Sequence, residues 1–205
     1  MSPNSSIIYV VDDDESVGRA LFLLLKSYDF RVEVFTRAAD FLSFKHLKMP
    51  SCLLLDINLP DIDGLVLQEK MVQEEMGIPI IFITGCGDIP KSVKAVKAGA
   101  IDFFTKPFTP TKLVDAISLA ISESKITNKN NAETARIWKN IKTLSPRELE
   151  VFRLVVSGML SKQIASKRGT ALQTIKVHRG RVMQKMQAKT VTELIHFAQK
   201  AGIAT

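Results

Sequence analysis

The sequence has 205 residues, 46% of them hydrophobic, a length that fits one domain of ordinary size followed by a small one. No apolar run approaches the ~18 residues of a membrane span, and the N-terminus lacks the basic flank and cleavage site of a secretory leader. We therefore expect a cytoplasmic protein without a membrane partner. Cys52 and Cys86 lack the spacing of a zinc site and are expected to be reduced thiols.

Charge is divided unevenly along the chain. Residues 1–122 hold 12 Lys and Arg against 16 Asp and Glu, a net charge of −4, whereas residues 123–205 hold 16 against 5, a net charge of +11. An excess of positive charge confined to one part of a chain is typical of nucleic-acid binding. The C-terminal part is therefore the candidate DNA-binding part.

Up to about residue 122, short apolar runs alternate with amphipathic stretches. Strands are predicted at residues 7–12, 31–35, 52–57, 79–84 and 101–105, and helices at 16–28, 38–47, 64–75, 88–98 and 110–122. Continuous Ile, Val, Leu and Phe runs indicate strands buried on both faces of a parallel sheet. The prediction is an α/β domain over residues 1–122, a flavodoxin-like five-stranded parallel (βα)5 fold.

The alternation of apolar runs and amphipathic stretches stops at residues 123–142, which are rich in Asn, Lys, Thr and Ser. We therefore predict a linker there that is helical over residues 132–141. Four helical patterns without a strand follow, at residues 146–156, 161–167, 172–186 and 191–201. Ser145, Pro146 and Glu148 form the sequence pattern of a capping box at the start of the first. Residues 143–205 are therefore predicted to be an all-α four-helix domain.

Polar side chains stand where the predicted strands end. Asp12 and Asp13 follow the first strand, Asp56 ends the third, Thr84 the fourth, and Lys106 follows the fifth. The carboxyl ends of parallel strands meet at one edge, where carboxylates repel one another unless a cation, here Mg²⁺, lies among them. Asp56 lies in an otherwise apolar run, and a carboxylate can accept a phosphoryl group. Each feature alone also fits ordinary capping or turn chemistry, but the combination favours a phosphoryl site.

Residues 6–122 resemble the response-regulator receiver family. The resemblance rests on the strings VVDDDESV, LLLDINLPDIDG, IPIIFITGCGD and KAGAIDFFTKPF. It implies that Asp56 takes a phosphoryl group from a sensor histidine kinase. It also implies that Mg²⁺ is held by Asp12, Asp13, Asp56 and the backbone carbonyl of Asn58.

The same resemblance implies a conformational switch. Lys106 would contact the phosphoryl group, and its bond to Pro107 is usually cis in the family. Thr84 and Phe103 would be the switch pair, in which movement of the threonine hydroxyl opens space for the ring. Phe103 stands where the family commonly has Tyr, so the switch would act by packing alone, and the neighbouring Phe104 competes for this role.

The C-terminal part has the layout of a helix-turn-helix, with a short helix at residues 161–167, a turn at Gly169 and a longer helix. We expect the basic face of the longer helix to enter the major groove. The expected base-edge contacts are Gln173, Lys176, Val177 and Arg179, with Gly180 as an alternative to Arg179. The expected phosphate contacts are Lys162, Thr174, Arg181 and Lys185. Ala171 precedes that helix without a capping side chain, which leaves Thr170 or water as the cap.

Residues 144–202 resemble the FixJ/NarL/LuxR-type DNA-binding domain through LSPRELEVFRLVVSGMLSKQIA and TIKVHRGRVMQKM, and the similarity to FixJ-type regulators spans both domains. The implied function is that of a DNA-binding response regulator of a two-component system. Phosphorylation would drive homodimerisation through the face of helix 88–98 and strand 101–105, and then activation of a promoter with RNA polymerase. The residues expected in that face are Val93, Val96, Lys97 and Ile101.

Two other hypotheses stay open at this point. The pattern Asp12-x-Asp14-x-Ser16 partly matches haloacid-dehalogenase-like phosphatases, in which Asp12 would be the nucleophile. Alternatively, the chain is a constitutive DNA binder or sigma-factor-like promoter reader whose first domain is only a scaffold. We expect a regulator and not an enzyme, because Ser16 departs from the phosphatase pattern and a phosphatase needs no DNA-binding part. The intact acidic pocket argues against a constitutive DNA binder.

Overall fold

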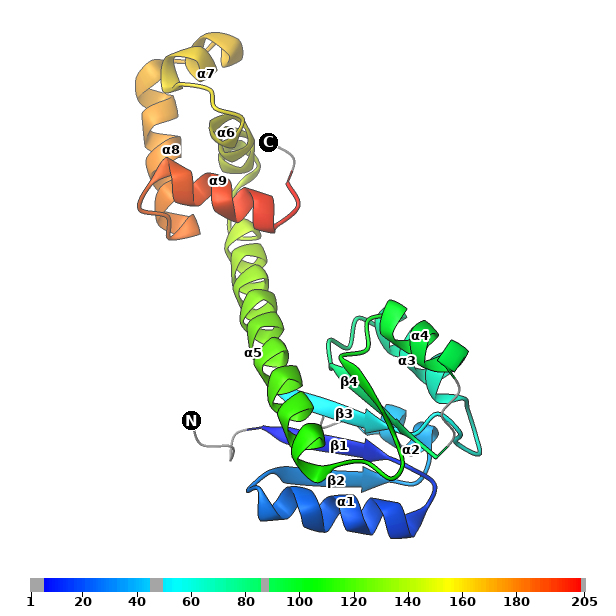
Figure 1. Ribbon diagram of the computed structural model, residues 1–205. Helices are drawn as coiled ribbons and strands as arrows, with labels where there is room; N and C mark the ends of the chain where they lie inside the picture. Colours follow the sequence, from blue (N-terminus) through cyan, green and yellow to red (C-terminus); the bar gives the residue numbers. More distant parts are fainter. Residues whose placement is uncertain (1–5, 45–49, 86–88, 204–205) are drawn as a thin grey trace. The chain divides into compact units, whose positions relative to one another are not determined.

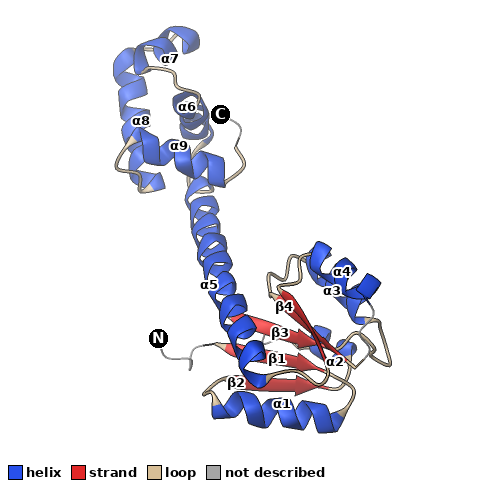
Figure 2. Cartoon of the chain, in the orientation of Figure 1, coloured by secondary structure: helices blue, strands red, loops and turns tan. Residues whose placement is uncertain are grey.

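The computed structural model describes residues 6–44, 50–85 and 89–203, and in the first part of the chain strands and helices alternate as predicted. The strands are β1 Ile7–Val11, β2 Arg31–Phe35, β3 Ser51–Leu55, β4 Ile80–Thr84 and β5 Asp102–Thr105. The helices are α1 Glu15–Ser27, α2 Ala38–Ser43, α3 Gly64–Gln73, α4 Ile89–Lys97 and α5 Pro110–Ile141. Figures 1 and 2 show these elements along the chain.

All strand pairs of the sheet are parallel, in the order β2-β1-β3-β4-β5. The three central strands β1, β3 and β4 are buried along their whole length, as expected for a sheet covered by helices on both faces. The chain places β2 on one side of β1 and then adds β3, β4 and β5 on the other side, so the direction in which strands are added reverses between β1 and β3. This is the flavodoxin-like order, in which functional groups collect at the carboxyl ends of the strands near that reversal.

Two hydrophobic clusters cover the two faces of the sheet. One joins the sheet to α2, α3 and α4 through residues such as Phe41, Leu67 and Ala95. The other joins it to α1 and the first part of α5 through residues such as Leu25 and Ile117. Alternate residues of each strand enter opposite clusters, because successive strand side chains point to opposite faces.

Helix α5 is longer than predicted. It is continuous from Pro110 to Ile141, whereas the sequence predicted that it ends near residue 122 and that a partly helical linker follows. Neither Gly nor Pro interrupts this segment after Pro110, so its polar residues leave the helix unbroken. The described residues form two compact units, 1–128 and 129–205, and the division falls within α5.

The second unit consists of the end of α5 and four further helices: α6 Pro146–Val156, α7 Ser161–Arg168, α8 Leu172–Met186 and α9 Val191–Lys200. The predicted capping box is present, with Ser145 and Glu148 capping each other's backbone. Helix α8 has Ala171 at its N-cap and therefore no side-chain cap, and Gly169 takes the left-handed conformation (φ 60°) in the turn before it. Ile137 and Ile141 of α5 are buried in this unit's core.

Three further expectations concern the end of α2, the two cysteines and membrane-spanning helices. Helix α2 ends at Ser43, before the predicted residue 47, and residues 45–49 lie outside the described part of the chain. Cys52 is a buried free thiol whose pKa burial raises, while Cys86 is outside the described residues. Among the helices described, none is long and apolar enough to cross a membrane.

Candidate functional site

The register of the central strands brings two of the predicted carboxylates together. Val11 of β1 lies opposite Leu55 of β3, so Asp12 and Asp56, each the next residue, leave the sheet side by side. The backbone N–H of Asp56 donates to the carbonyl of Val11 at 2.9 Å, which extends the ladder to the phosphoacceptor candidate. The position of this pair is therefore fixed by the main chain of the sheet.

Lys106 arrives at the same edge from β5. Thr84 and Thr105 are opposite each other in the β4–β5 pair, and the next N–H, that of Lys106, donates to the carbonyl of Thr84 at 2.7 Å. The bond between Lys106 and Pro107 is cis, as the family resemblance implied. Thr84 and Lys106 thus lie at the carboxyl ends of their strands, as predicted.

Three carboxylates and one ammonium group converge at this edge. Carboxylate oxygens of Asp12, Asp13 and Asp56 lie within 4.8 Å of one another. The Lys106 Nζ lies 2.6 Å from Asp12 Oδ2 and 3.9 Å from Asp56 Oδ1. Asp12 Oδ1 also accepts a hydrogen bond from the Asp14 backbone at 3.1 Å. Asp56 Oδ1, in contrast, is buried and has no hydrogen-bond partner among the described residues.

The electrostatics of the pocket suit a bound cation. Burial raises the pKa of Asp56 above its ordinary value, Lys106 opposes this shift, and the charges of Asp12 and Asp13 add to it. A divalent cation among these oxygens would remove the repulsion, and carboxylate oxygens are the ligands that Mg²⁺ prefers. The residues therefore fit a Mg²⁺ site. The backbone carbonyl of Asn58 stays a predicted ligand.

The loop after Asp56 is held closely at both ends. A Cβ added to Gly64 would lie 2.4 Å from the carbonyl oxygen of Asp56, and the Gly64 N–H donates to the Ile57 carbonyl at 2.7 Å. The Asp61 carboxylate, within the loop, accepts hydrogen bonds from two backbone N–H groups at the start of α2, at 3.3 and 2.9 Å. Only glycine fits at position 64, because any Cβ there would collide with the backbone of Asp56.

Phe103 and Phe104, the two candidates for the switch ring, lie on opposite faces of the sheet. Phe103 packs in the cluster shared with α2, α3 and α4, with its ring centroid 6.4 Å from that of Phe82. Phe104 packs in the opposite cluster, with α1 and α5. Thr84 follows Phe82 by two residues and therefore points to the face that holds Phe103. Phe103 and not Phe104 shares the face of Thr84.

Helix α8 presents most of the predicted DNA contacts to solvent. Its buried stripe is Ile175, Val182 and Met186, and the exposed positions lie on the opposite side. Arg179 is partly buried and donates to Ser161 Oγ, at the start of α7, at 3.1 Å. The exposed members of the predicted set are Lys162 on α7 and, on α8, Gln173, Thr174, Lys176, Val177 and Arg181.

Lys185 is the exception among these residues. Its Nζ lies 2.6 Å from Glu148 Oε2 and 2.9 Å from the carbonyl of Thr143, so it ties the end of α8 to the start of α6. Hydrogen bonds from Lys185 and from the Ser145 backbone lower the pKa of Glu148 to about 2. The partners are 37 residues apart, and no local pattern in the sequence indicates their pairing.

Comparison with known proteins identifies relatives over both units. The family model described as the response regulator receiver domain matches residues 8–118, and that of the luxR family of bacterial regulatory proteins matches residues 142–198. Nodulation protein W of Bradyrhizobium diazoefficiens is 40% identical over 199 residues, which are 97% of this chain and 88% of that protein. Response regulator protein TodT of Pseudomonas putida is 39% identical over 200 residues, 98% of this chain and 88% of that protein.

Two solved structures are similar to this chain over nearly its whole length. A structure of response regulator StyR has a TM-score of 0.83 and 39% sequence identity, and the match covers 96% of this chain and 99% of that one. Full-length FixJ from B. japonicum has a TM-score of 0.58 and 36% identity, over 97% of this chain and 98% of that one.

Proposed function

Because the chain belongs to the response regulators that join a receiver to a LuxR-type DNA-binding domain, we propose that phosphorylation of Asp56 by a sensor histidine kinase controls its binding to promoter DNA. Both families are regulatory and not enzymatic. The observation that carries the choice of residue is the buried Asp56 Oδ1, which has no hydrogen-bond partner among the described residues and lies 3.9 Å from Lys106 Nζ.

Asp56 is a better phosphoacceptor than Asp12, the nucleophile of the phosphatase alternative. Both Asp12 oxygens are engaged, one by Lys106 and the other by the backbone of Asp14. An oxygen held by a 2.6 Å charged hydrogen bond is a weaker nucleophile than Asp56 Oδ1, which has no hydrogen-bond partner among the described residues and lies 3.9 Å from Lys106 Nζ. The Oδ1 of Asp56 attacks phosphorus, the bond from phosphorus to the donor's imidazole nitrogen breaks, and an acyl phosphate results.

The neighbouring residues hold this reaction in place. Mg²⁺, when bound, neutralises phosphoryl charge beside the carboxylates of Asp12 and Asp13. The Lys106 ammonium is placed to move from Asp12 to a phosphoryl oxygen, since it already lies between the two carboxylates. Its charge there would stabilise the product.

The readout we propose is repacking of β4, β5 and α4. A phosphoryl oxygen draws the hydroxyl of Thr84 toward Asp56, and Phe103 on the same face moves into the space. The homodimer would form through α4 and β5, where Val93 and Val96 are 46% and 50% exposed, with Lys97 and Ile101 beside them. Apolar side chains exposed three residues apart on one helix face suit a second copy of that face.

The second unit would bind a two-half-site promoter in the cytoplasm and bring RNA polymerase to it. Gln173, Lys176 and Val177 of α8 are exposed on one side and are the proposed base contacts, with Arg179 as a further contact that must leave Ser161. Lys162, Thr174 and Arg181 are the proposed phosphate contacts. Lys185 is now proposed as a structural residue, because Glu148 already neutralises its charge.

Intact-mass spectrometry after treatment with acetyl phosphate and Mg²⁺ tests the phosphoacceptor. We expect one added phosphoryl group in wild type and in the control Asp115→Asn, whose carboxylate is exposed on α5, and none in Asp56→Asn. Labelling of Asp56→Asn would refute the assignment. Hydrolysis of p-nitrophenyl phosphate by the wild type, lost in Asp12→Asn, would instead support the phosphatase.

Salt titration of promoter binding tests the DNA contacts. The slope of log K against log salt is negative, and replacing a basic residue that neutralises one phosphate reduces its magnitude by about 0.9. A base contact changes the preferred sequence instead. We expect Arg181→Gln to make this negative slope shallower. We expect Lys185→Gln to leave the slope unchanged while destabilising the domain. A reduced slope for Lys185→Gln would restore it as a phosphate contact.

A further inference from the structure

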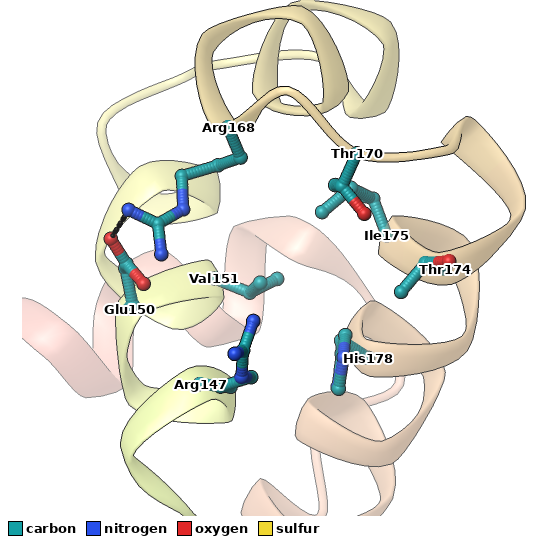
Figure 3. Close-up of a pocket in the computed structure, with 8 residues that line it drawn as sticks. All are labelled: Arg147, Glu150, Val151, Arg168, Thr170, Thr174, Ile175 and His178. Carbon is teal, nitrogen blue, oxygen red and sulfur yellow. Dashed lines mark ion pairs between the residues drawn. The ribbon is translucent and has the colours of Figure 1, made fainter.

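A small pocket lies between α6, α7 and α8 of the DNA-binding domain, and the family resemblance gave it no role. Its volume is about 50 Å³, whereas a single water needs about 10–15 Å³. It therefore has room for one group of the size of a tetrahedral anion. Figure 3 shows the residues that line it, which are Arg147, Glu150, Val151, Arg168, Thr170, Thr174, Ile175 and His178.

Hydrogen-bond donors converge on this pocket from three helices and a turn. Arg147 and Arg168 lie on the side of α6 and α7, while Thr170, Thr174 and His178 lie on the side of α8 (Figure 3). The His178 Nδ1 is buried and, within the described residues, has no hydrogen-bond partner. A buried imidazole nitrogen without a partner costs stability unless a group that the protein itself does not supply pairs with it.

The charges of the pocket favour an anion. Arg168 forms an ion pair with Glu150, which neutralises the only carboxylate that lines the pocket (Figure 3). The Arg147 guanidinium has no ion pair or hydrogen bond with the residues that the structure describes, so one positive charge remains. The adjacent start of α8 adds unsatisfied N–H groups, because Ala171 provides no side-chain cap.

We propose that this pocket binds a single phosphate group. Its tetrahedral oxygens match donors that come from several directions, namely the Arg147 guanidinium and the hydroxyls of Thr170 and Thr174, and the His178 ring lines the same pocket. Val151 and Ile175 form the apolar part of the lining and hold no competing charge. The phosphate is either one of the DNA backbone or that of a small phosphorylated molecule.

Nitrogen-15 NMR of the full-length protein, labelled at its three histidines, tests this proposal with inorganic phosphate as the probe in Mg²⁺-free buffer. We expect saturable shifts of the His178 ring nitrogens, while His196, exposed on α9, serves as the internal reference. Arg147→Gln should weaken phosphate binding at least about tenfold, the effect of one charge-assisted hydrogen bond. Arg153→Gln, an exposed arginine of the same helix outside the pocket, should change it less than about twofold.

Thr174→Val provides a second variant that removes a donor and keeps the side-chain shape. A nonspecific DNA duplex, added at constant ionic strength, identifies the source. Displacement of inorganic phosphate by DNA would support a backbone phosphate, and continued phosphate binding on saturated DNA would support a small phosphorylated molecule. No saturable shift at His178, or equal shifts in Arg147→Gln and wild type, would overturn the proposal. Phosphate binding is first measured without DNA. The outcome of that measurement therefore does not depend on whether the proposed control of promoter binding is correct.

Discussion

Replacing Gly64 with alanine should destabilise the receiver, although alanine is the better helix former. The alanine Cβ would lie 2.4 Å from the Asp56 carbonyl oxygen and 3.0 Å from the Ile57 Cα. Ordinary contact begins at 3.4 Å, so the start of α3 and the end of β3 must separate by about 1 Å. Both atoms belong to the backbone, which cannot rotate away as a flexible side chain would.

The magnitude follows from three opposed contributions. Helix propensity favours alanine by at most about 1 kcal/mol. Overpacking against backbone costs about 1–3 kcal/mol, and the separation also lengthens the 2.7 Å hydrogen bond from Gly64 to Ile57, worth about 1 kcal/mol. We expect a net loss of about 1–3 kcal/mol in the free energy of unfolding, together with slower phosphorylation of the displaced Asp56.

Scanning calorimetry of the full-length protein measures the effect, with hydrogen exchange to assign each transition to its unit. Each kcal/mol should lower the receiver's Tm by about 3–5 °C. Gly180→Ala is the matched control, because Gly180 is inside α8 with nothing within 4 Å of an added Cβ. That variant should gain up to about 1 kcal/mol. If Gly64→Ala also raises Tm, the steric reasoning is wrong.

Three further predictions concern two helix caps and the ion pair between Lys185 and Glu148. Ala171→Ser should raise the stability of the DNA-binding domain by about 0.5–2 kcal/mol in urea unfolding, by capping α8; an unchanged midpoint would show that the cap is not formed. Asp61→Ala should destabilise the receiver by about 1–2 kcal/mol in the same assay, because it uncaps α2, and Asp115→Ala, at an exposed position of α5, is its control. The pKa of Glu148 is lowered from 4.5 to about 2, so its contribution to stability is present above pH 4.5 and is lost as the pH falls toward 2. Thermal unfolding between pH 6 and 2.5 should show this loss in wild type and much less of it in Glu148→Gln.

The sequence predicted what depends on local pattern. Apolar runs located all five strands within one or two residues, and the residues at their ends converge because a parallel sheet in register must bring them together. The capping box at Ser145 was predictable for the same reason, since its two partners are three residues apart. The fold and the acidic pocket could therefore be predicted without coordinates.

What the sequence did not predict depends on distant partners. Lys185 has the composition of a DNA contact, and only the packing of α8 on α6 places Glu148 beside it. Gly64 has the appearance of a turn residue, and only the closeness of α3 to β3 shows that a Cβ is forbidden. The phosphate pocket combines residues of α6, α7 and α8 that no motif spans.

The continuity of α5 determines where the protein can be divided into fragments that fold. The sequence-based border at residue 143 would give a DNA-binding fragment without Ile137 and Ile141, which are 1% and 7% exposed in its core. That fragment would also lack Glu133, the partner of Lys200 in α9. We propose residue 129 as the start of a fragment that folds on its own, and expect a fragment that begins at 143 to be recovered as aggregate. The last part of α5, which carries Glu133, Ile137 and Ile141, therefore belongs to the DNA-binding domain and must stay with it when the chain is divided.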